Sequence, residues 1–289
     1  MNPQATRTLA DEIRRNLDRL TPTERRPAQV LLTHYPLAGL GTVSEFAARA
    51  GVSPPTILRL VAKLGCSGYA DFQRRLRQEL EARLQTPLTK HEGPEPPVAE
   101  AVALPAFVRT VQANIEQTLL GLPDTELAAA VALLADIRRP VHLLGGRFTH
   151  PLAAYLCRHL RILRPRVSLV DGRPASWPET LLDMGKRDVL VVFDIRRYQD
   201  DVVAFAEAAA RRGAAVVLFT DPWLSPVARV ARHVFPAHID VGGSWDSSVG
   251  ILVLVEALIH GLNERDWTRV KARIGALEAL RAGPDRPEG

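Results

Sequence analysis

Apolar residues recur at the spacing of an α-helix through the first third of the chain. This pattern predicts helices over residues 6–20, 22–35 and 69–84, with two shorter helices between the last two. The sequence TPTE at 21–24 marks the start of the second helix, because a capping threonine, an early proline and a glutamate favour a helix N-terminus. We therefore expect an all-α N-terminal domain.

The two shorter helices are the most informative stretch of the chain. The first covers about Val43 to Ala50 and ends at Gly51, since glycine closes a helix cheaply in the left-handed conformation. Ser53 stands at the N-cap of the next helix and Pro54 at its first position. That helix carries an apolar stripe on one face, formed by Ile57, Leu60, Val61 and Leu64, and polar residues on the other, Thr56, Arg59 and Lys63.

A helix, a tight turn and a second helix with a basic outer face are typical of a DNA-binding helix-turn-helix. The second helix of such a motif enters the major groove and reads base edges. We predict that Ser53, Thr56, Arg59 and Lys63 contact the duplex. An ordinary helical hairpin inside a larger domain is the alternative.

The pattern changes after residues 85–105, which contain five prolines and predict a linker or an extended arm. Short apolar runs then alternate with helices, which predicts a parallel sheet covered on both faces. The expected fold is an all-α helix-turn-helix domain at 1–84 joined to a three-layer α/β (α-β-α) domain at 106–289. We expect strands at 140–146, 166–172, 187–194, 214–221 and 233–239, the last as an edge strand, and helices at 106–120, 124–136, 150–163, 200–212, 247–262 and 266–281.

Ligands of such sheets bind at the carboxyl ends of the strands. The loops after the strands at 140–146 and 187–194 carry arginine, a side chain that grips carboxylate or phosphate through two parallel hydrogen bonds, so a small anionic effector is expected. Asp194 would repel an anion unless a neighbouring arginine pairs with it or it accepts a ligand hydroxyl, and mutual neutralisation would leave an unused pocket. The residues expected to bind the effector are Gly145, Arg147, Thr149, Asp194, Arg196, Arg197, Ser247 and Ser248.

Composition and charge narrow the class of protein. With 46% hydrophobic and 24% charged residues and no apolar run as long as a membrane span, we expect a soluble, cytoplasmic protein without membrane contact. Residues 1–90 hold 14 Lys and Arg against 8 Asp and Glu, whereas residues 91–289 hold 23 against 24. The excess positive charge favours attraction to phosphate, although a solvated basic surface has the same composition. The two cysteines form no metal or disulfide framework, and no cofactor is expected.

The chain resembles the RpiR/MurR family of bacterial transcription regulators, in which a helix-turn-helix precedes a sugar isomerase (SIS) domain. The resemblance is carried by LTPTERRPAQVLL at 20–32, by AARAGVSPPTILRLVAKLGCSGYADF at 47–72 and by the order of strands after residue 140. SIS domains typically cradle a sugar phosphate in a glycine–serine loop and in a Ser-x-Ser-Gly-x-Thr loop. The corresponding loops here are GGRFT at 145–149 and DIRRYQ at 194–199.

The leading hypothesis is a transcriptional regulator that binds a palindromic operator in double-stranded DNA as a homodimer or tetramer and senses a small anionic metabolite, a sugar phosphate or a carboxylate. The alternative is an SIS-fold sugar-phosphate isomerase or lyase with an appended DNA-binding module. Its acid–base candidates, His150, Asp194 and Glu256, form no evident pair, so we expect no enzyme. A third hypothesis is a sensor domain that has lost its ligand.

Leucines in the last two helices lie either in a dimer interface or in the core: Leu252, Leu254, Leu258, Leu277 and Leu280.

Overall fold

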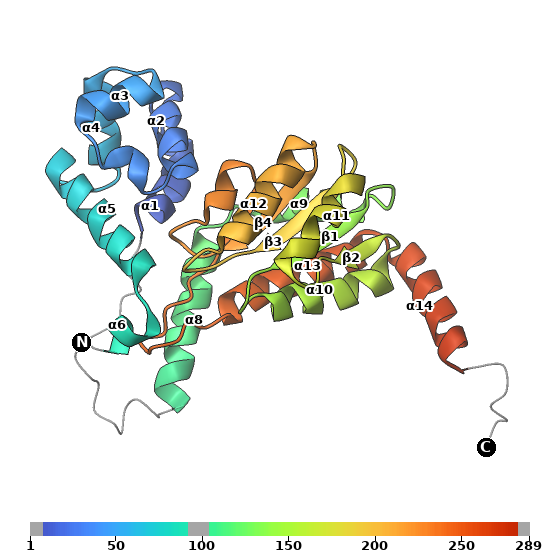
Figure 1. Ribbon diagram of the computed structural model, residues 1–289. Coiled ribbons are helices and arrows are strands. Elements are labelled where there is room, and N and C mark those ends of the chain that lie inside the picture. Colours follow the sequence, from blue (N-terminus) through green and yellow to red (C-terminus); the bar gives the residue numbers. More distant parts are fainter. Residues whose placement is uncertain (1–7, 92–103, 283–289) are drawn as a thin grey trace.

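The structure, a computed structural model, describes residues 8–91 and 104–282 (Figure 1). An all-α head lies beside an α/β domain, as the sequence predicted. The head contains helices α1 (Leu9–Asn16), α2 (Pro22–Thr33), α3 (Val43–Ala50), α4 (Pro54–Lys63) and α5 (Tyr69–Leu84). A short helix, α6 (Pro87–His91), follows α5.

Three helices of the head begin with the same local signal. A threonine hydroxyl accepts a hydrogen bond from the backbone N–H three residues later, and the acid at that later position accepts one from the N–H of the threonine. Each pair satisfies two helix donors that would otherwise lack partners. The pairs are Thr8–Asp11, Thr21–Glu24 and Thr42–Glu45. The predicted helix start at 21–24 is confirmed, whereas α1 is shorter than expected and continues as a 3-10 turn over Leu17–Arg19.

The turn between α3 and α4 has the predicted conformation. Gly51 adopts the left-handed region, with φ 64° and ψ 37°, so the chain reverses there without a side-chain clash. The predicted apolar stripe of α4 is buried against Phe46 of α3 and Phe72 of α5. The head therefore has a hydrophobic core of its own.

Within the described residues, five parallel strands form one sheet in the order β2-β1-β3-β4-β5. The strands are β1 (Val141–Gly145), β2 (Val167–Leu169), β3 (Val189–Phe193), β4 (Ala215–Thr220) and β5 (His233–Pro236). Helices α9 (Asp124–Ala135), α10 (His150–Leu163) and α13 (Val249–Arg265) cover one face, while α11 (Trp177–Asp183) and α12 (Asp200–Arg211) cover the other. On the first side, α8 (Leu104–Leu120) packs on α13, and α14 (Trp267–Ala282) packs on α10. The predicted parallel sheet with covered faces is confirmed.

Alternate residues of the central strands pack into the two helical layers. Val191 and Phe193 face α9, α10 and α13, while Leu190 and Val192 face α11 and α12. Burial on both faces explains why these strands read as unbroken apolar runs. The rings of Phe193, Phe219 and Phe235 stack across three adjacent strands, with centroids 4.8 and 5.0 Å apart.

The predicted linker is partly wrong. Residues 87–91 form α6 and pack against the α/β domain, and residues 92–103 lie outside the described residues. The sequence also gave no signal for α11. Of the five leucines offered as core or interface, Leu254 and Leu258 are core, whereas Leu280 is 81% exposed on α14, which extends away from the body of the protein (Figure 1).

No single helix among the described residues is long and apolar enough to cross a membrane, although α8 and α9 together pass that test despite an 82° bend between them.

The head packs directly on the α/β domain. His238 lies with Nε2 3.3 Å from Oδ2 of Asp11, and both side chains are buried. Arg15 donates to Oε1 of Gln117 at 2.9 Å, and Leu224 joins the hydrophobic core of the head. Movement of the head relative to the sheet would therefore break polar and apolar contacts together.

Candidate DNA interface and effector pocket

Ser53 and Arg59 lie on the solvent-exposed side of the helix-turn-helix, where the sequence placed them. Thr56 requires a correction, because its side chain is only 3% exposed. Its Oγ1 accepts a hydrogen bond from Nη2 of Arg59 at 3.0 Å and lies 3.1 Å from Oγ of Ser53. Thr56 thus orients the guanidinium of Arg59 through this hydrogen bond and is itself buried. Ser53 occupies the N-cap position, but its side chain makes no capping hydrogen bond.

Lys63 lies on the predicted polar face of α4, but its ammonium group binds other residues of the head. Its Nζ donates to Oε2 of buried Glu24 at 2.7 Å and to the carbonyl of Arg19 at 3.2 Å. Burial acts to raise the pKa of Glu24, but hydrogen bonds from Lys63 and Thr21 outweigh it and lower that pKa. Lys63 therefore holds α4 against α2, and Arg59 remains the long donor that points outward.

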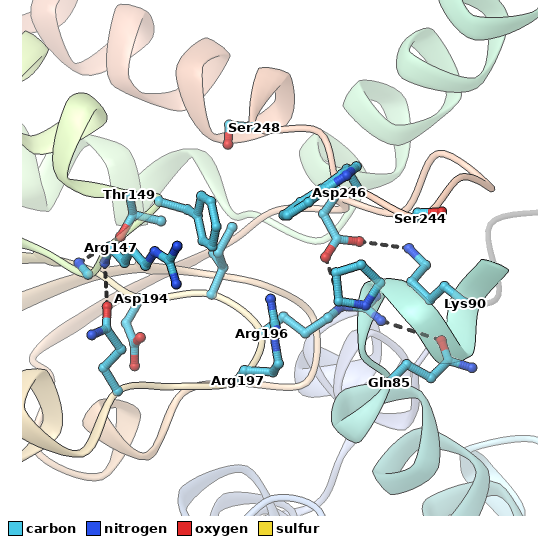
Figure 2. A pocket seen from close by; sticks show the side chains of 16 residues that line it. Gln85, Lys90, Arg147, Thr149, Asp194, Arg196, Arg197, Ser244, Asp246 and Ser248 are labelled. Carbon is cyan, nitrogen blue, oxygen red and sulfur yellow. Dashed lines mark hydrogen bonds and ion pairs between the residues drawn. The ribbon is translucent and has the colours of Figure 1, made fainter.

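A cavity of about 420 Å³ opens at the carboxyl ends of β1 and β3 (Figure 2). The strand order reverses between these two strands, which is where open α/β sheets bind ligands. The walls come from the segments 146–149, 194–199 and 244–248, though not from Tyr198 or Ser247, and from Gln85, Pro87 and Lys90 after the head. The pocket therefore lies at the junction between the two parts of the protein.

Two backbone donors of the loop after β1 are already hydrogen-bonded to side chains of this protein. The N–H of Gly146 donates to Oγ1 of Thr149 at 2.8 Å, and this hydroxyl donates to the carbonyl of Phe193 at 2.6 Å. The N–H of Arg147 donates to the side-chain oxygen of Gln199. The chain's own side chains thus occupy donors that could otherwise cradle an anion.

Two of the predicted effector residues do not line the cavity. A Cβ on Gly145 would lie 2.6 Å from the backbone N of His150, so this glycine permits the close approach of α10. Ser247 accepts a hydrogen bond from the N–H of Val249 and lies outside the wall, whereas Ser248 forms part of it.

Arg147 and Arg197 are exposed at the cavity and form no ion pair among the described residues. The guanidinium of Arg147 lies 5.2 Å from the ring centre of Phe148, and that ring meets Trp245 edge to face at 5.5 Å. Arg197 has φ 56°, a left-handed conformation that costs a residue with a side chain about 1 kcal/mol. Contacts of the neighbouring residues hold the loop in this shape.

Asp194 is buried and forms no ion pair with Arg196 or Arg197, so the pairing that was one of the alternatives is not present. Its carboxylate accepts a hydrogen bond from the hydroxyl of Ser225. Burial, together with the nearby charge of Asp221, raises the pKa of Asp194 to about 7 in spite of that hydrogen bond. This carboxyl therefore gains or loses its charge near neutral pH.

Arg196 is also buried, and it is not free to meet a ligand as the sequence suggested. Its Nε lies 3.0 Å from Oδ2 of Asp246 and its Nη2 lies 3.5 Å from Oδ2 of Asp240. The aspartates belong to the segment before α13, and no sequence pattern pairs them with the loop after β3.

The other acid–base candidates lie away from the cavity. Nε2 of His150 lies 3.7 Å from Oδ1 of Asp171, and exposed Glu256 accepts a hydrogen bond from the hydroxyl of Tyr155. Neither His150 nor Glu256 lines the wall, so Asp194 has no second candidate beside it. The three residues form no acid–base pair.

Sequence reasoning missed the part of the wall contributed by the predicted linker. Gln85, Pro87 and Lys90 line the cavity together with Trp245 and Asp246. A lysine among prolines gave no local signal of burial, yet the side chain of Lys90 is only 7% exposed. Trp245 and Asp246 directly precede the predicted Ser247 and Ser248, but no pattern in the sequence pointed to them.

The fold defines a helix-turn-helix protein with an α/β domain that has a pocket at its strand switch point. Residues 7–83 match the family model of the helix-turn-helix domain of the rpiR family, and residues 133–261 match that of the SIS domain. The chain therefore belongs to the RpiR family of transcriptional regulators.

Curated relatives extend over most of the chain. The regulator HexR of Pseudomonas aeruginosa is 25% identical over 90% of each chain. A bifunctional protein glk of Paraburkholderia xenovorans is 26% identical over 92% of this chain but only 43% of its own length. The chain thus spans less than half of the glk proteins that it matches.

Solved structures agree on the fold. The sugar isomerase domain of an RpiR transcription factor from Sphaerobacter thermophilus is 28% identical, with a TM-score of 0.56 over 61% of this chain and 98% of its own. NanR of Vibrio vulnificus, solved with ManNAc-6P, is 18% identical and covers 94% of this chain and 98% of its own, with a TM-score of 0.53.

Proposed function

We propose that this protein binds operator DNA through α3 and α4 and that a small anionic metabolite in the pocket modulates this binding. One observation carries the effector assignment: Arg147 and Arg197 reach a 420 Å³ cavity at the strand switch point without an ion-pair partner among the described residues. Two free guanidinium groups attract a dianion or a carboxylate. The sugar phosphate ManNAc-6P bound by NanR supports the same ligand class.

The proposed division of the chain has a DNA-binding domain at 1–84, a connecting segment at 85–105 and an effector-sensing, dimerising domain at 106–289. Arg59 is the proposed reader of a base edge and Ser53 a phosphate contact. Because one helix-turn-helix covers a half-site, we propose a homodimer or tetramer on a palindromic operator in the cytoplasm. The exposed Trp267 and Leu280 of α14 offer apolar surface for that assembly.

The SIS-enzyme alternative has one supporting observation, the pKa of Asp194 near 7, which suits proton transfer. General acid–base chemistry needs a second positioned group, and neither His150 nor Glu256 lines the cavity. The relatives named as transcriptional regulators also favour a protein that binds DNA without catalysis. Incubation with a panel of sugar phosphates, followed by analysis for aldose–ketose conversion, tests this alternative.

The effector site is tested by screening metabolites for a thermal shift and measuring whether each hit changes operator affinity. Arg147→Ala and Arg197→Ala should weaken the response about tenfold each, since each removes a charge-assisted contact. Arg173→Ala is the matched control, because Arg173 is exposed after β2 but does not line the cavity. A double variant that responds to the metabolite as wild type does would remove the pocket from the proposed function.

A further inference from the structure

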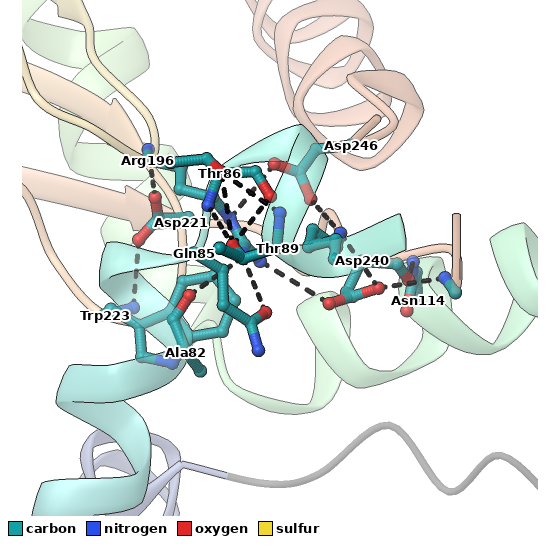
Figure 3. A network of polar contacts seen from close by, with 12 residues as sticks. Ala82, Gln85, Thr86, Thr89, Asn114, Arg196, Asp221, Trp223, Asp240 and Asp246 are labelled. Atoms are coloured by element: carbon teal, nitrogen blue, oxygen red, sulfur yellow. Dashed lines mark hydrogen bonds and ion pairs between the residues drawn. The ribbon is translucent and has the colours of Figure 1, made fainter. Parts of the chain in front are cut away.

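Arg196 connects the pocket to the last turn of the DNA-binding head (Figure 3). Its Nη1 donates to the backbone carbonyl of Ala82 at 2.9 Å and lies 3.5 Å from Oε1 of Gln85. Ala82 belongs to the last turn of α5, and α5 packs through Phe72 and Leu76 into the core that contains the recognition helix. One guanidinium thus touches both the cavity and the end of a head helix.

The connecting segment is attached to the same network. Lys90 of α6 has its Nζ 2.9 Å from Oδ1 of Asp246 and 3.4 Å from Oδ1 of Asp240. The same two aspartates lie against Arg196, so four charges from three segments balance one another. The segment over residues 82–90 is therefore held to the α/β domain from both of its ends.

The backbone N–H of Arg196 has a buried hydrogen-bond partner, whereas its side-chain Nε has none among the described residues. Its N–H donates to buried Asp221 at 2.6 Å, and its guanidinium lies 4.3 Å from the ring centre of Trp223. The side-chain Nε is close to Asp246 but is not directed along a hydrogen bond to it. An anion that offers better-aligned oxygens in the cavity would compete for this guanidinium.

We propose that Arg196 is a positioning residue that holds the C-terminal end of α5 to the pocket and that an anion in the cavity releases it. The inference rests on the proposed effector site. Arg147 and Arg197 attract the anion, and Arg196 turns from the carbonyl of Ala82 towards it. Release of α5 then loosens the head from the α/β domain, which changes the presentation of α4 to DNA. A ligand can act in this way because it binds the released state better than the held state.

The first test needs no ligand. Hydrogen exchange of peptides that cover residues 80–91 is measured in wild type, Arg196→Gln and Arg173→Gln, with full-length protein. Loss of the charge-assisted hydrogen bond should speed exchange in Arg196→Gln about tenfold, while Arg173→Gln, which changes an exposed arginine outside the cavity, should match wild type. Equal exchange in Arg196→Gln and wild type would overturn the proposal. If Arg196→Gln does not fold, Lys90→Gln removes a charge from the α6 side and should speed exchange in the same peptides.

The second test adds an anion. Inorganic phosphate or glucose 6-phosphate should speed exchange of residues 80–91 in wild type towards the Arg196→Gln level, and neutral glucose should not. The same anions should add nothing in Arg196→Gln, which a purely structural role of Arg196 does not explain. Binding of an anion by calorimetry with unchanged exchange overturns release by ligand. If neither anion binds wild type, the effector site and its coupling fail together, and the first test alone decides whether Arg196 holds α5.

Discussion

In the head, acidic side chains cap the N-termini of helices. Each forms reciprocal hydrogen bonds with a threonine three residues earlier, as Glu24 does with Thr21. In the pocket, Asp240 and Asp246 balance Arg196 and Lys90, which come from distant segments; Lys90 and Asp246 are separated by 156 positions. The capping acids of the head are therefore placed by local sequence, whereas the ion pairs of the pocket are placed only by the fold. This difference decides which of them could be recognised before the structure.

Both regions nevertheless bury one carboxyl whose pKa lies near neutrality. In the head, burial raises the pKa of Glu79 to about 7, although Tyr35 and the N–H of Leu9 donate hydrogen bonds to it. In the pocket, burial has the same effect on Asp194. The two carboxyls permit a direct comparison of the regions by titration.

Glu79→Gln should have the largest effect. The pKa of Glu79 is raised from 4.5 to about 7, so between these values the native state binds more protons than the unfolded state. Its stabilisation is full below about pH 4.5 and is lost as pH rises through 7, a change of about 3 kcal/mol. The variant should show a flatter dependence of unfolding free energy on pH in urea titrations from pH 5 to 8. Parallel curves would show that Glu79 does not titrate in this range.

Asp194→Asn is the counterpart in the pocket and should flatten the same dependence, since the pKa of Asp194 is also raised. If fluorescence resolves unfolding of the head from that of the α/β domain, each variant should alter only its own transition. A change in both transitions from one variant would mean that the regions unfold together.

Arg59→Ala should come next, with a loss of about 1–3 kcal/mol of operator binding and relaxed specificity at one base position. The reason is that Arg59 is the exposed guanidinium of α4, supported by Thr56. Fluorescence anisotropy with operator and mutated operators measures both effects. Arg77→Ala, which removes an exposed arginine from α5, is the control and should leave specificity unchanged. Retained specificity in Arg59→Ala contradicts its role as a base reader.

Two cap positions of the head should respond differently. Thr21→Ala should destabilise the head by about 1 kcal/mol, because its hydroxyl caps α2. Ser53→Ala should cost less than about 0.5 kcal/mol, because the Ser53 hydroxyl makes no capping hydrogen bond to α4. Urea denaturation of both variants measures the difference. Equal losses would show that Ser53 caps its helix in solution.

Lys63→Ala should also have a small effect, about 0.5 kcal/mol of stability, since its pair with Glu24 is partly exposed. Operator and random DNA should lose affinity by the same small factor, because Lys63 is tied to α2 and does not read a base. A loss of affinity for the operator alone would show that Lys63 contacts a base.

The sequence predicted the head well because its signals are local. Gly51, the cap at Thr21 and the stripe from Ile57 to Leu64 each act within one or two helical turns. The buried strands were also recognisable, since runs such as 189–193 are apolar throughout. The buried state of Thr56 could not be read from its spacing, because its place depends on how α4 rotates against α2 and α3.

The pocket was only partly predictable. The strand-end rule correctly brought Arg147, Asp194 and Arg197 to one cavity. It could not reveal that Arg196 forms an ion pair with Asp246, or that α6 contributes to the wall. These contacts join segments that share no sequence pattern. Periodicity describes single elements, whereas ion pairs between loops depend on the packed chain.

The wall that α6 contributes has an evolutionary consequence. Lys90 and Gln85 line the cavity that we propose for a metabolite, and Gln85 directly follows α5 of the head. A substitution in this segment changes which molecule fits and how the head is held in a single step. Under the proposed function, the preference for an effector and the strength of the response are therefore coupled, and paralogues that differ over residues 85–90 should differ in both properties.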